Sequence, residues 1–425
     1  MENKKKLIII GCGSRGKTYA DQALKSGNFE VVALAEPIDE RREYLQELTG
    51  VTDELAFTSW EPLLALGKIA DVAVIATMDR DHFAPAAEAM KLGYDLLLEK
   101  PAAATPEECD ALLDIATKYG RRVVVCHVLR YTPFFRALKR IIDDGMIGKV
   151  MNIQHTEGVG NLHQSHSFVR GNWGNAERST PMILQKSCHD MDIIQWLVGK
   201  KCLSVQSFGS LSYFTEENAP EGAPEFCISG CPEYDTCPYN AVKLYYDDKK
   251  NGWFRGAAAK MHRPTDEGVL NAIKTTNYGR CVFRCDNNVV DHQVVNLLFE
   301  EGVIASFTMS AFTKGGREIR IMGTHGEIFA KMNCDTITVN AFSDRSTKEI
   351  KVADMQPGDS IVGGHGGGDT GIIGALYAML NGTPSPDLST LDISVENHKI
   401  AFAAELSRLT GKVVSVAGGE IRIPD

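Results

Sequence analysis

The chain has 425 residues, of which 44% are hydrophobic and 24% are charged, and its formal net charge is −10. This length exceeds one typical domain core, so we expect two domains. The acidic balance argues against a nucleic-acid partner, because no basic cluster exceeds Lys4-Lys5-Lys6. We also expect no membrane partner, since no apolar run approaches the length of a membrane span.

The first predicted element is a buried strand that runs into a glycine-rich turn. Residues 7–16 read Leu-Ile-Ile-Ile-Gly-Cys-Gly-Ser-Arg-Gly, and a helical pattern follows over 17–24. Glycines spaced as G-x-G-x-x-G make a tight turn and let the backbone approach a phosphate at the helix N-terminus. The pattern predicts a dinucleotide site. Its candidate cofactor-binding residues are Gly11, Gly13, Ser14, Arg15 and Gly16.

A second predicted strand covers 29–35 and ends at an acidic residue, Glu36. This carboxylate lies twenty residues past Gly16, where the dinucleotide fold places an acid against the adenosine ribose 2′-hydroxyl. A carboxylate there predicts NAD rather than NADP, because a 2′-phosphate would be repelled. Arg41 and Arg42 lie close enough in sequence to soften that preference, and an ordinary surface glutamate is the alternative interpretation.

Strands and helices alternate along the rest of the first 130 residues. The predicted strands cover 71–77, 95–98 and 122–126, and the predicted helices cover 84–92 and 106–119. Because a crossover helix separates each strand from the next, the strands are expected to run parallel. The pattern predicts an α/β domain of the Rossmann type over residues 1–130.

The pattern changes after about residue 150, where longer strands are joined by short turns. The predicted strands cover 150–155, 294–299, 303–309 and 318–323, with a hairpin turn at 300–302 and a helix over 370–380. We therefore predict an α+β domain over 131–425, built on a mostly antiparallel open sheet. The stretch near 214–285 is rich in Pro, Gly, Cys, Asp and Lys, which is typical of an insertion.

The cysteine usage indicates a reducing compartment. The chain has 11 cysteines, an odd number, and several lie inside apolar or motif segments rather than in a disulfide framework. The first strand begins within seven residues and leaves no signal-peptide pattern, so we expect a cytoplasmic protein.

Several cysteines gather in the insertion at spacings that raise the question of a metal. Cys227, Cys231 and Cys237 follow one another there, and Cys281 and Cys285 close the segment. Crowded soft thiolates suit a structural Zn²⁺ or an iron–sulfur cluster. The candidate ligands are the first three cysteines with Cys281 or Cys285 as the fourth. Free thiols in a loop-rich segment are the alternative interpretation.

Further motifs turn this general pattern into a resemblance to a known family. They are Asp79-Arg80-Asp81-His82, Glu99-Lys100-Pro101, Gly145-Met146-Ile147-Gly148-Lys149-Val150 and Lys186-Ser187-Cys188-His189-Asp190-Met191-Asp192. In this order they resemble the glucose–fructose oxidoreductase and inositol dehydrogenase family (Gfo/Idh/MocA) over nearly the whole chain. The resemblance implies a Rossmann domain, a substrate-binding domain with an open sheet, and hydride transfer with NAD.

The resemblance also implies the catalytic residues. Lys100 of the E-K-P motif would hold the substrate hydroxyl, and His189 would exchange its proton as general base or acid. Asp192 falls three residues later on the same helical side and could orient the histidine ring. The sequence departs from the family at Gln185, where many members carry Asp, and neighbouring Lys186 could compensate in charge. A buried, satisfied helix histidine is the alternative for His189.

The remaining candidates come from polar clusters and from the family landmarks. A segment over 163–173 is polar and aromatic, as sugar recognition requires, although a solvated loop is the alternative. A glycine-rich loop over 363–369 precedes a predicted helix and borders the substrate pocket in the family. The substrate-binding candidates are His163, His166, Arg170, Trp173 and His365, with Gln185, Lys186 and Asp192, and the further cofactor-binding candidates are Thr77, His82, Glu99 and Lys100.

Three functions are compatible with these residues. The favoured one is an NAD-dependent dehydrogenase acting on a secondary hydroxyl of a sugar, polyol or cyclitol. The second is an NAD-dependent glycosidase, which oxidises the sugar transiently, eliminates the aglycone and reduces the product again; Gln185 slightly favours it. The third is a non-catalytic sugar sensor, against which the retention of Lys100 and His189 argues. A homodimer or homotetramer is expected, as in the family.

Overall fold

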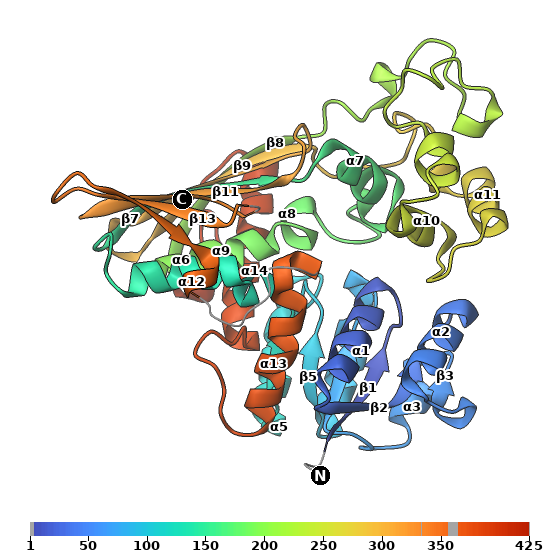
Figure 1. Cartoon of the computed structure of the whole chain (residues 1–425), viewed down its shortest axis with the longest axis horizontal. Helices are drawn as coiled ribbons and strands as arrows, with labels where there is room; N and C mark the ends of the chain where they lie inside the picture. The colour runs from blue at the N-terminus through green and yellow to red at the C-terminus, as the bar shows by residue number, and fades with distance from the viewer. Residues whose placement is uncertain (1–3, 333, 356–363, 425) are drawn as a thin grey trace.

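A computed structural model describes residues 4–332, 334–355 and 364–424 of the chain. Within them the first lobe contains a six-stranded sheet in the order β3-β2-β1-β4-β5-β6, and all its pairs are parallel (Figure 1). Its strands are β1 (Lys5–Ile10), β2 (Phe29–Ala35), β3 (Ala56–Phe57), β4 (Val72–Ile75), β5 (Asp95–Leu98) and β6 (Val123–Val125). The predicted parallel Rossmann-type sheet is confirmed.

Five helices connect these strands within the described part of the chain. They are α1 (Ser14–Ser26), α2 (Asp39–Thr49), α3 (Trp60–Leu64), α4 (Phe83–Lys91) and α5 (Pro106–Tyr119). Local signals explain the bounds of α5: the Thr105 side chain accepts the Glu108 N–H, Pro106 opens the helix, and Gly120 ends it with φ +61°. The order of strands reverses at β1, between β2 and β4, and open α/β sheets bind their ligands at such a reversal.

The core of the first lobe also uses residues from the end of the chain. Helix α13 (Gly368–Leu380) packs Ile372 and Leu376 into the same buried cluster as Leu7 and Ile9 of β1. Helix α14 (Leu391–Thr410) adds Leu391 and Val395 to the cluster on the other side of the sheet. Both faces of the parallel sheet are therefore covered, as its continuous apolar strands require.

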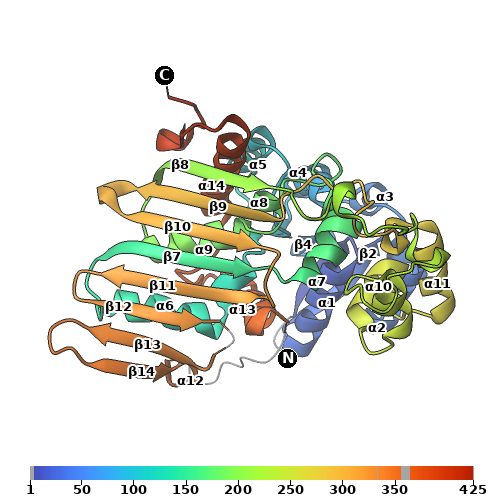
Figure 2. The same ribbon diagram turned by 90° about the horizontal axis from the view of Figure 1, so that it is seen from above.

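The second lobe contains a nine-stranded sheet in the described residues, ordered β14-β13-β12-β11-β7-β10-β9-β8-β15 (Figure 2). All pairs are antiparallel except β10 with β7, so the predicted mostly antiparallel sheet is confirmed. Its strands are β7 (Val150–Gly158), β8 (Cys202–Ser210), β9 (His292–Phe299), β10 (Ile304–Ser310), β11 (Gly316–Gly323), β12 (Gly326–Lys331), β13 (Thr336–Ala341), β14 (Thr347–Lys351) and β15 (Val414–Ser415).

One face of this sheet is covered by helices and the other is open. Residues along β9 alternate between exposed and buried, which is the pattern of a strand with one packed face. The helices are α6 (Pro133–Asp143), α9 (Cys188–Val198), α12 (Val352–Met355) and α14, with α7 (Asn161–His163) and α8 (Met182–Gln185) at the edge nearest the first lobe (Figure 2). No helix among the described residues is long and apolar enough to cross a membrane.

The chain between β8 and β9 forms an appendage beyond the sheet. It contains α10 (Gly252–Ala259) and α11 (Asp266–Thr275), and it lies over α1 and α2 of the first lobe (Figures 1 and 2). The appendage has its own small hydrophobic core, in which Tyr245, Phe254 and Ile273 are buried. The segment predicted as an insertion is therefore a packed helical unit, and we call it the insertion below.

Candidate active site

The glycine-rich turn between β1 and α1 has the geometry that a dinucleotide requires. Gly11 has φ +92°, and a Cβ atom there would lie 2.4 Å from the Ala76 carbonyl oxygen. A Cβ atom on Gly16 would lie 2.0 Å from the Gly11 carbonyl oxygen. Gly13 differs, since the nearest atom to its Cβ position is Arg41 Nη1 at 3.7 Å. The outer two glycines make the turn, and the middle one leaves space above it.

Glu36 is fixed at the carboxyl end of β2 by two backbone donors. Its Oε2 accepts the Cys12 N–H at 2.7 Å, and its Oε1 accepts the Ile38 N–H at 3.0 Å. The residue is only 4% exposed. Arg42 donates to the Glu36 carbonyl at 2.8 Å and pairs with Asp39, so its guanidinium is engaged outside the carboxylate.

The described residues fit an NAD-type cofactor at this turn. Helix α1 begins at Ser14, which is exposed, and its first turn carries no acidic residue to oppose a phosphate. The buried Thr77 Oγ1, just beyond β4, has no hydrogen-bond partner among the described residues, so it is available to a ligand. The glycine turn would hold the pyrophosphate, and the fixed carboxylate of Glu36 would hold the ribose. The Thr77 hydroxyl would hold the remainder of the dinucleotide.

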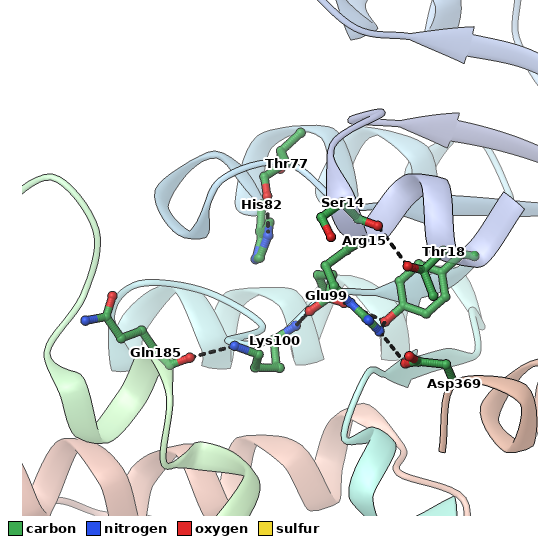
Figure 3. A network of polar contacts seen from close by, with 10 residues as sticks. Ser14, Arg15, Thr18, Thr77, His82, Glu99, Lys100, Gln185 and Asp369 are labelled. Carbon is green, nitrogen blue, oxygen red and sulfur yellow. Dashed lines mark hydrogen bonds and ion pairs between the residues drawn. The ribbon is translucent and has the colours of Figure 1, made fainter. Parts of the chain in front are cut away.

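Arg15 and Glu99, both predicted to bind the cofactor, bind each other (Figure 3). Arg15 Nε donates to Glu99 Oε1 at 2.7 Å, and Arg15 Nη2 donates to Asp369 Oδ1 at 2.7 Å. The Tyr19 hydroxyl also donates to Glu99, whose Oε2 accepts the Lys100 N–H. Burial would raise the pKa of Glu99, but the charges of Arg15 and Lys100 outweigh it and lower that pKa. This network joins α1, the E-K-P loop and α13.

His82 joins the two loops that follow β4 and β5. Its Nδ1 lies 2.7 Å from the Pro101 carbonyl oxygen, and its Nε2 lies 3.2 Å from the Thr77 carbonyl oxygen. The ring is buried. The shorter contact is the one to the Pro101 carbonyl, through which His82 positions the loop that carries Lys100.

The Lys100 ammonium reaches across from the first lobe to the second (Figure 3). Its Nζ donates to the Gln185 carbonyl oxygen at 2.6 Å, at the end of α8. The Gln185 side chain is held separately: its Nε2 donates to the Trp173 carbonyl at 2.8 Å, and its Oε1 lies 3.0 Å from Ser179 Oγ. The structure therefore brings together Lys100, Gln185 and Trp173 from the sequence-based candidates.

Asp79 holds the segment before α8 in place through its side chain. The sequence indicated this residue only as part of a motif. The buried carboxylate accepts hydrogen bonds from Trp173 Nε1 at 3.1 Å, Ser179 Oγ at 2.7 Å and Thr180 Oγ1 at 3.2 Å. These contacts link the loop after β4 to the segment before α8. A signal was available, because Asp79 follows a parallel strand at its carboxyl end.

His189 lies on the first turn of α9 beside a second histidine that the sequence did not single out. His189 is 5% exposed, and its ring centroid is 5.9 Å from that of His127, edge to face. His127 follows β6 and is fully buried, with neither ring nitrogen hydrogen-bonded among the described residues. Burial, and then the charges of Arg130 and Lys100, lower the pKa of His127, so this ring is neutral.

Asp192 does not line the site as predicted. Its two carboxylate oxygens accept hydrogen bonds from Arg130 Nε and Nη2, each at 2.7 Å, and Oδ1 also accepts from Asn397 Nδ2 at 2.7 Å. The residue is fully buried. A carboxylate at this position secures α9 against the start of the second lobe and against α14, and it has no exposed surface for a substrate.

Lys186 belongs to a buried charge cluster between α9 and the large sheet. Its Nζ lies 3.1 Å from Glu157 Oε1, and Arg317 pairs with both Glu157 and Asp190. Burial raises the pKa of Glu157, assisted by the charge of Asp190. His155 completes the cluster by contacting Asp190 Oδ1 at 2.7 Å. Lys186 is therefore paired with a carboxylate of β7 rather than acting as an isolated charge beside Gln185.

The centre of the polar segment over 163–173 is buried, so the alternative of a solvated loop is wrong there. Its centre is a buried π-helix, Gln164–Arg170. His166 stacks on Phe254 of the insertion with centroids 4.1 Å apart, and its Nδ1 lies 3.1 Å from the Tyr245 hydroxyl. His163 also packs its ring against the insertion, on Trp253. The insertion covers these side chains, so the prediction that they face a substrate is corrected for His166.

Arg170 is likewise directed into the insertion. It is buried, and it donates to the carbonyl oxygens of Arg280 at 2.9 Å and Tyr239 at 2.8 Å. Its Nη2 also lies 3.8 Å from Cys227 Sγ. The side chain therefore binds the backbone of the insertion, and the predicted substrate contact is corrected.

The predicted metal centre is not found. Within the described part of the chain, no group of three or more His, Cys, Asp and Glu side chains is arranged to hold a metal ion. The thiols make local contacts instead: Cys227 Sγ lies 3.8 Å from the Arg280 carbonyl, and Cys285 Sγ lies 3.4 Å from the Cys281 carbonyl. Burial raises the pKa of Cys285 to about 11 and also raises those of Cys237 and Cys281. This raised pKa favours the neutral thiol form of Cys237, Cys281 and Cys285.

The glycine-rich loop before α13 is only partly described. His365 lies in the short 3-10 turn Gly364–Gly367, and its side chain is outside the described residues. Asp369 follows in the first turn of α13 and pairs with Arg15, as described above.

Comparison with known proteins identifies the family. A model for an oxidoreductase family with an NAD-binding Rossmann fold matches residues 5–127, and its C-terminal alpha/beta domain matches residues 139–370. The chain belongs to the Gfo/Idh/MocA oxidoreductase family. The first lobe is the NAD-binding Rossmann fold of that family, and the second lobe is its C-terminal alpha/beta domain.

Individual relatives are distant. YteT of Bacillus subtilis (strain 168), whose name calls it an oxidoreductase, is 24% identical over 394 residues, covering 88% of each chain. An inositol 2-dehydrogenase of Klebsiella pneumoniae subsp. pneumoniae is 28% identical over 205 residues, which are 47% of this chain and 56% of that protein. The match therefore spans only about half the length of such inositol dehydrogenases.

Solved structures share the fold over the whole chain. A levoglucosan dehydrogenase in complex with NADH and levoglucosan has a TM-score of 0.72 and 17% identity, covering 98% of this chain and 100% of that chain. An oxidoreductase from Agrobacterium radiobacter in complex with NAD⁺, L-tartaric acid and magnesium has a TM-score of 0.68 and 15% identity, covering 97% and 99%. At these identities the likeness concerns the fold alone.

Proposed function

We propose that this family member is an NAD-dependent dehydrogenase that oxidises a secondary hydroxyl of a sugar, polyol or cyclitol. The observation that carries the proposal is the contact of Lys100 Nζ with the Gln185 carbonyl at 2.6 Å. It sets a primary ammonium at the carboxyl edge of the parallel sheet, where open α/β folds bind ligands, and against the helix pair that carries His189. Relatives named as inositol 2-dehydrogenases support this substrate class, because inositol is a hydroxyl-rich compound.

The chemistry divides between the cofactor and two side chains. When bound, NAD supplies the acceptor for a hydride from the carbinol carbon. The Lys100 ammonium donates a hydrogen bond to the reacting hydroxyl and stabilises the negative charge that grows on its oxygen as the proton leaves. His189 takes that proton as general base and returns it in the reverse reaction, because imidazole exchanges protons near neutral pH.

Gln185 leaves His189 as the proton acceptor on its side of the site. A carboxamide accepts no proton at neutral pH, and the Nε2 of this one donates to the Trp173 carbonyl. Its backbone carbonyl, rather than its side chain, accepts a hydrogen bond from the Lys100 ammonium and orients it. The role of this residue is therefore to position Lys100.

The proposed cofactor preference is for NAD over NADP. The Glu36 carboxylate is fixed by the Cys12 and Ile38 amides at the end of β2, and each of its oxygens has capacity for a further hydrogen bond. A ribose 2′-hydroxyl can donate to such an oxygen, whereas a 2′-phosphate would place like charges together.

The experiment combines a substrate panel with substitutions at the two proposed catalytic residues. The purified protein is screened against sugars, cyclitols and aryl glycosides, with NADH absorbance and aglycone release recorded together. On the best substrate we expect Lys100→Ala and His189→Ala each to lower kcat by about 10²–10⁴-fold. Lys118→Ala, on the exposed side of α5, is the matched lysine control.

The outcomes separate the candidate functions. NADH formation that both substitutions abolish supports the dehydrogenase. Aglycone release without net NADH would instead make the protein an NAD-dependent glycosidase. Near-parental turnover in both variants would show that the assigned roles are wrong, and failure to bind NAD would overturn the redox function as a whole.

A further inference from the structure

A turn of the insertion touches the glycine-rich loop of the dinucleotide site. The turn covers residues 260–263, between α10 and α11, and we call it the clasp. His262 Nε2 donates to the Cys12 carbonyl oxygen at 2.7 Å, and Cys12 lies between Gly11 and Gly13. Burial lowers the pKa of His262, which keeps the ring neutral with its proton on Nε2. A segment 250 positions away in the sequence thus contacts the wall of the cofactor site.

The clasp also binds α2, which follows the strand that carries Glu36. The Glu40 carboxylate accepts the backbone N–H of His262 at 2.8 Å and that of Arg263 at 2.9 Å. Arg263 Nη1 pairs with Glu47 Oε2 at 2.7 Å. The Tyr44 ring lies between, 4.8 Å from the His262 ring and 4.7 Å from the Arg263 guanidinium carbon. The clasp therefore spans from the glycine turn to α2, which it contacts from Glu40 to Glu47.

Close packing inside the insertion fixes the shape of the clasp. Lys260 ends α10 in the left-handed region, with φ +56°, and redirects the chain toward the first lobe. A Cβ atom on Gly256 would lie 2.8 Å from the Met261 carbonyl oxygen, and one on Gly268 would lie 2.9 Å from Met261 Sδ. Helix α10 thus approaches the backbone of the clasp too closely for a residue larger than Gly256, and the tip of the clasp is presented as a preformed unit.

The clasp stands at the adenosine end of the proposed site. Glu36, the candidate acceptor for the adenosine ribose hydroxyl, is almost fully buried. Arg41, on the helix that the clasp grips, holds Nη1 3.7 Å from the Cβ position of Gly13, and its buried Nε has no hydrogen-bond partner among the described residues. The clasp and α2 therefore close one side of the space above the glycine turn.

We propose that the clasp is the outer wall of the dinucleotide site and that its contacts slow the release of the nicotinamide cofactor. This inference rests on the proposed function, since it needs a dinucleotide at the glycine turn. One part of the attachment is weak, because the Arg263 and Glu47 side chains are 65% and 59% exposed and such pairs contribute little individually. Cofactor exchange requires the clasp to detach from α2 and from Cys12.

The test measures how fast bound NADH leaves the full-length protein. NADH fluorescence is followed in a stopped-flow instrument after a chase with excess NAD. We expect His262→Ala, which removes the contact with Cys12, and Glu40→Ala, which removes both backbone contacts, to raise the dissociation rate about five- to tenfold. Arg284→Glu, which breaks an exposed ion pair with Glu216 within the insertion, is the control and should leave the rate unchanged.

A charge swap guards against variants that merely misfold. Arg263→Glu and Glu47→Arg should each speed NADH release, and the double variant should return it to within about twofold of the parent. Parental release rates in all clasp variants would overturn the inference while leaving the proposed function intact. A parent protein that binds neither NAD nor NADH by calorimetry would overturn the proposed function itself.

Discussion

His398 Nε2 accepts a hydrogen bond from the Ala102 amide at 2.9 Å, although the two residues are 296 positions apart. His398 Nδ1 lies 2.6 Å from the Ser394 carbonyl oxygen, so this nitrogen carries the proton and Nε2 is the acceptor. Burial lowers the pKa of His398 to about 3, so the ring stays neutral. A histidine on α14 thus secures the loop that presents Lys100.

Removal of this contact is expected to disturb catalysis more than cofactor binding. His398→Ala leaves the buried Ala102 N–H without an acceptor, which should lower the free energy of unfolding by about 1–3 kcal/mol. The E-K-P loop then loses its support, and we expect kcat to fall about tenfold or more with little change in the Kd for NAD. Steady-state kinetics, NAD titration and urea unfolding measure the three quantities.

A conservative variant distinguishes positioning from bulk packing. His398→Gln keeps an acceptor within reach of Ala102 and should recover part of kcat. Equal kcat in the parent and the alanine variant, with only stability lost, would reduce His398 to a packing residue.

Glu99 gives the fold a stability term that depends on pH. Its pKa is lowered in the folded protein, so this carboxylate stabilises the fold fully above the ordinary glutamate pKa of about 4.3. The contribution is lost as the pH falls through the lower folded-state pKa. Glu99→Gln removes it, so the stability difference between parent and variant should be large at pH 7 and should shrink below about pH 4.

Urea unfolding at pH steps from 7 to 3 checks this sign. Glu107→Gln, an exposed glutamate in the first turn of α5, controls for the loss of one carboxylate. A difference between parent and Glu99→Gln that does not change with pH would contradict the argument.

The Glu36 carboxylate should determine which dinucleotide the protein prefers. Glu36→Ala removes the acceptor for the ribose hydroxyl together with the negative charge. We expect the Kd for NAD to rise about ten- to hundredfold, while the Kd for NADP changes less or falls. Tryptophan fluorescence titration with both dinucleotides measures the ratio, and an unchanged ratio would remove Glu36 from the cofactor site.

The open face of the large sheet carries an apolar strip that we expect a second copy of the chain to cover. Ile304 of β10 and Leu298 of β9 are register partners, and they are 48% and 40% exposed. Ile304→Asp should therefore shift the sedimentation coefficient toward that of a monomer in analytical ultracentrifugation. Tyr119→Asp, an exposed residue on α5 of the first lobe, should not, and a parent protein that already sediments as a monomer would contradict the expectation.

Local signals predicted the first lobe well. The bounds of β5 and α5 agree with the sequence-based prediction, because each is delimited by its own apolar run, cap or glycine. The glycine turn and the acid at the end of β2 are likewise read from neighbouring residues. What the pattern did not reveal is the return of α13 and α14 to this lobe, since nothing within an apolar helix says which distant strand it will cover.

The second half of the site was harder to predict for the same reason. The segment over 163–173 has the composition of a sugar-binding loop, but its partners lie some 70–110 positions away, as with His166 and Tyr245 or Arg170 and Arg280. Composition cannot distinguish a side chain that meets water from one that meets a distant ring. Asp192 was placed correctly on the helix of His189, yet its engagement by Arg130 and Asn397 depends on three separate segments.

The engagement of Arg170 by the insertion has a consequence for protein engineering. A shortened chain that joins β8 directly to β9 would leave this guanidinium without its acceptors, and the His166 ring would lose its stacking partner. Such a truncation would expose the hydrophobic surface of the neighbouring π-helix to solvent and favour aggregation. The insertion therefore cannot be removed as a separate module. Grafting it onto another scaffold would require the π-helix to be transferred as well.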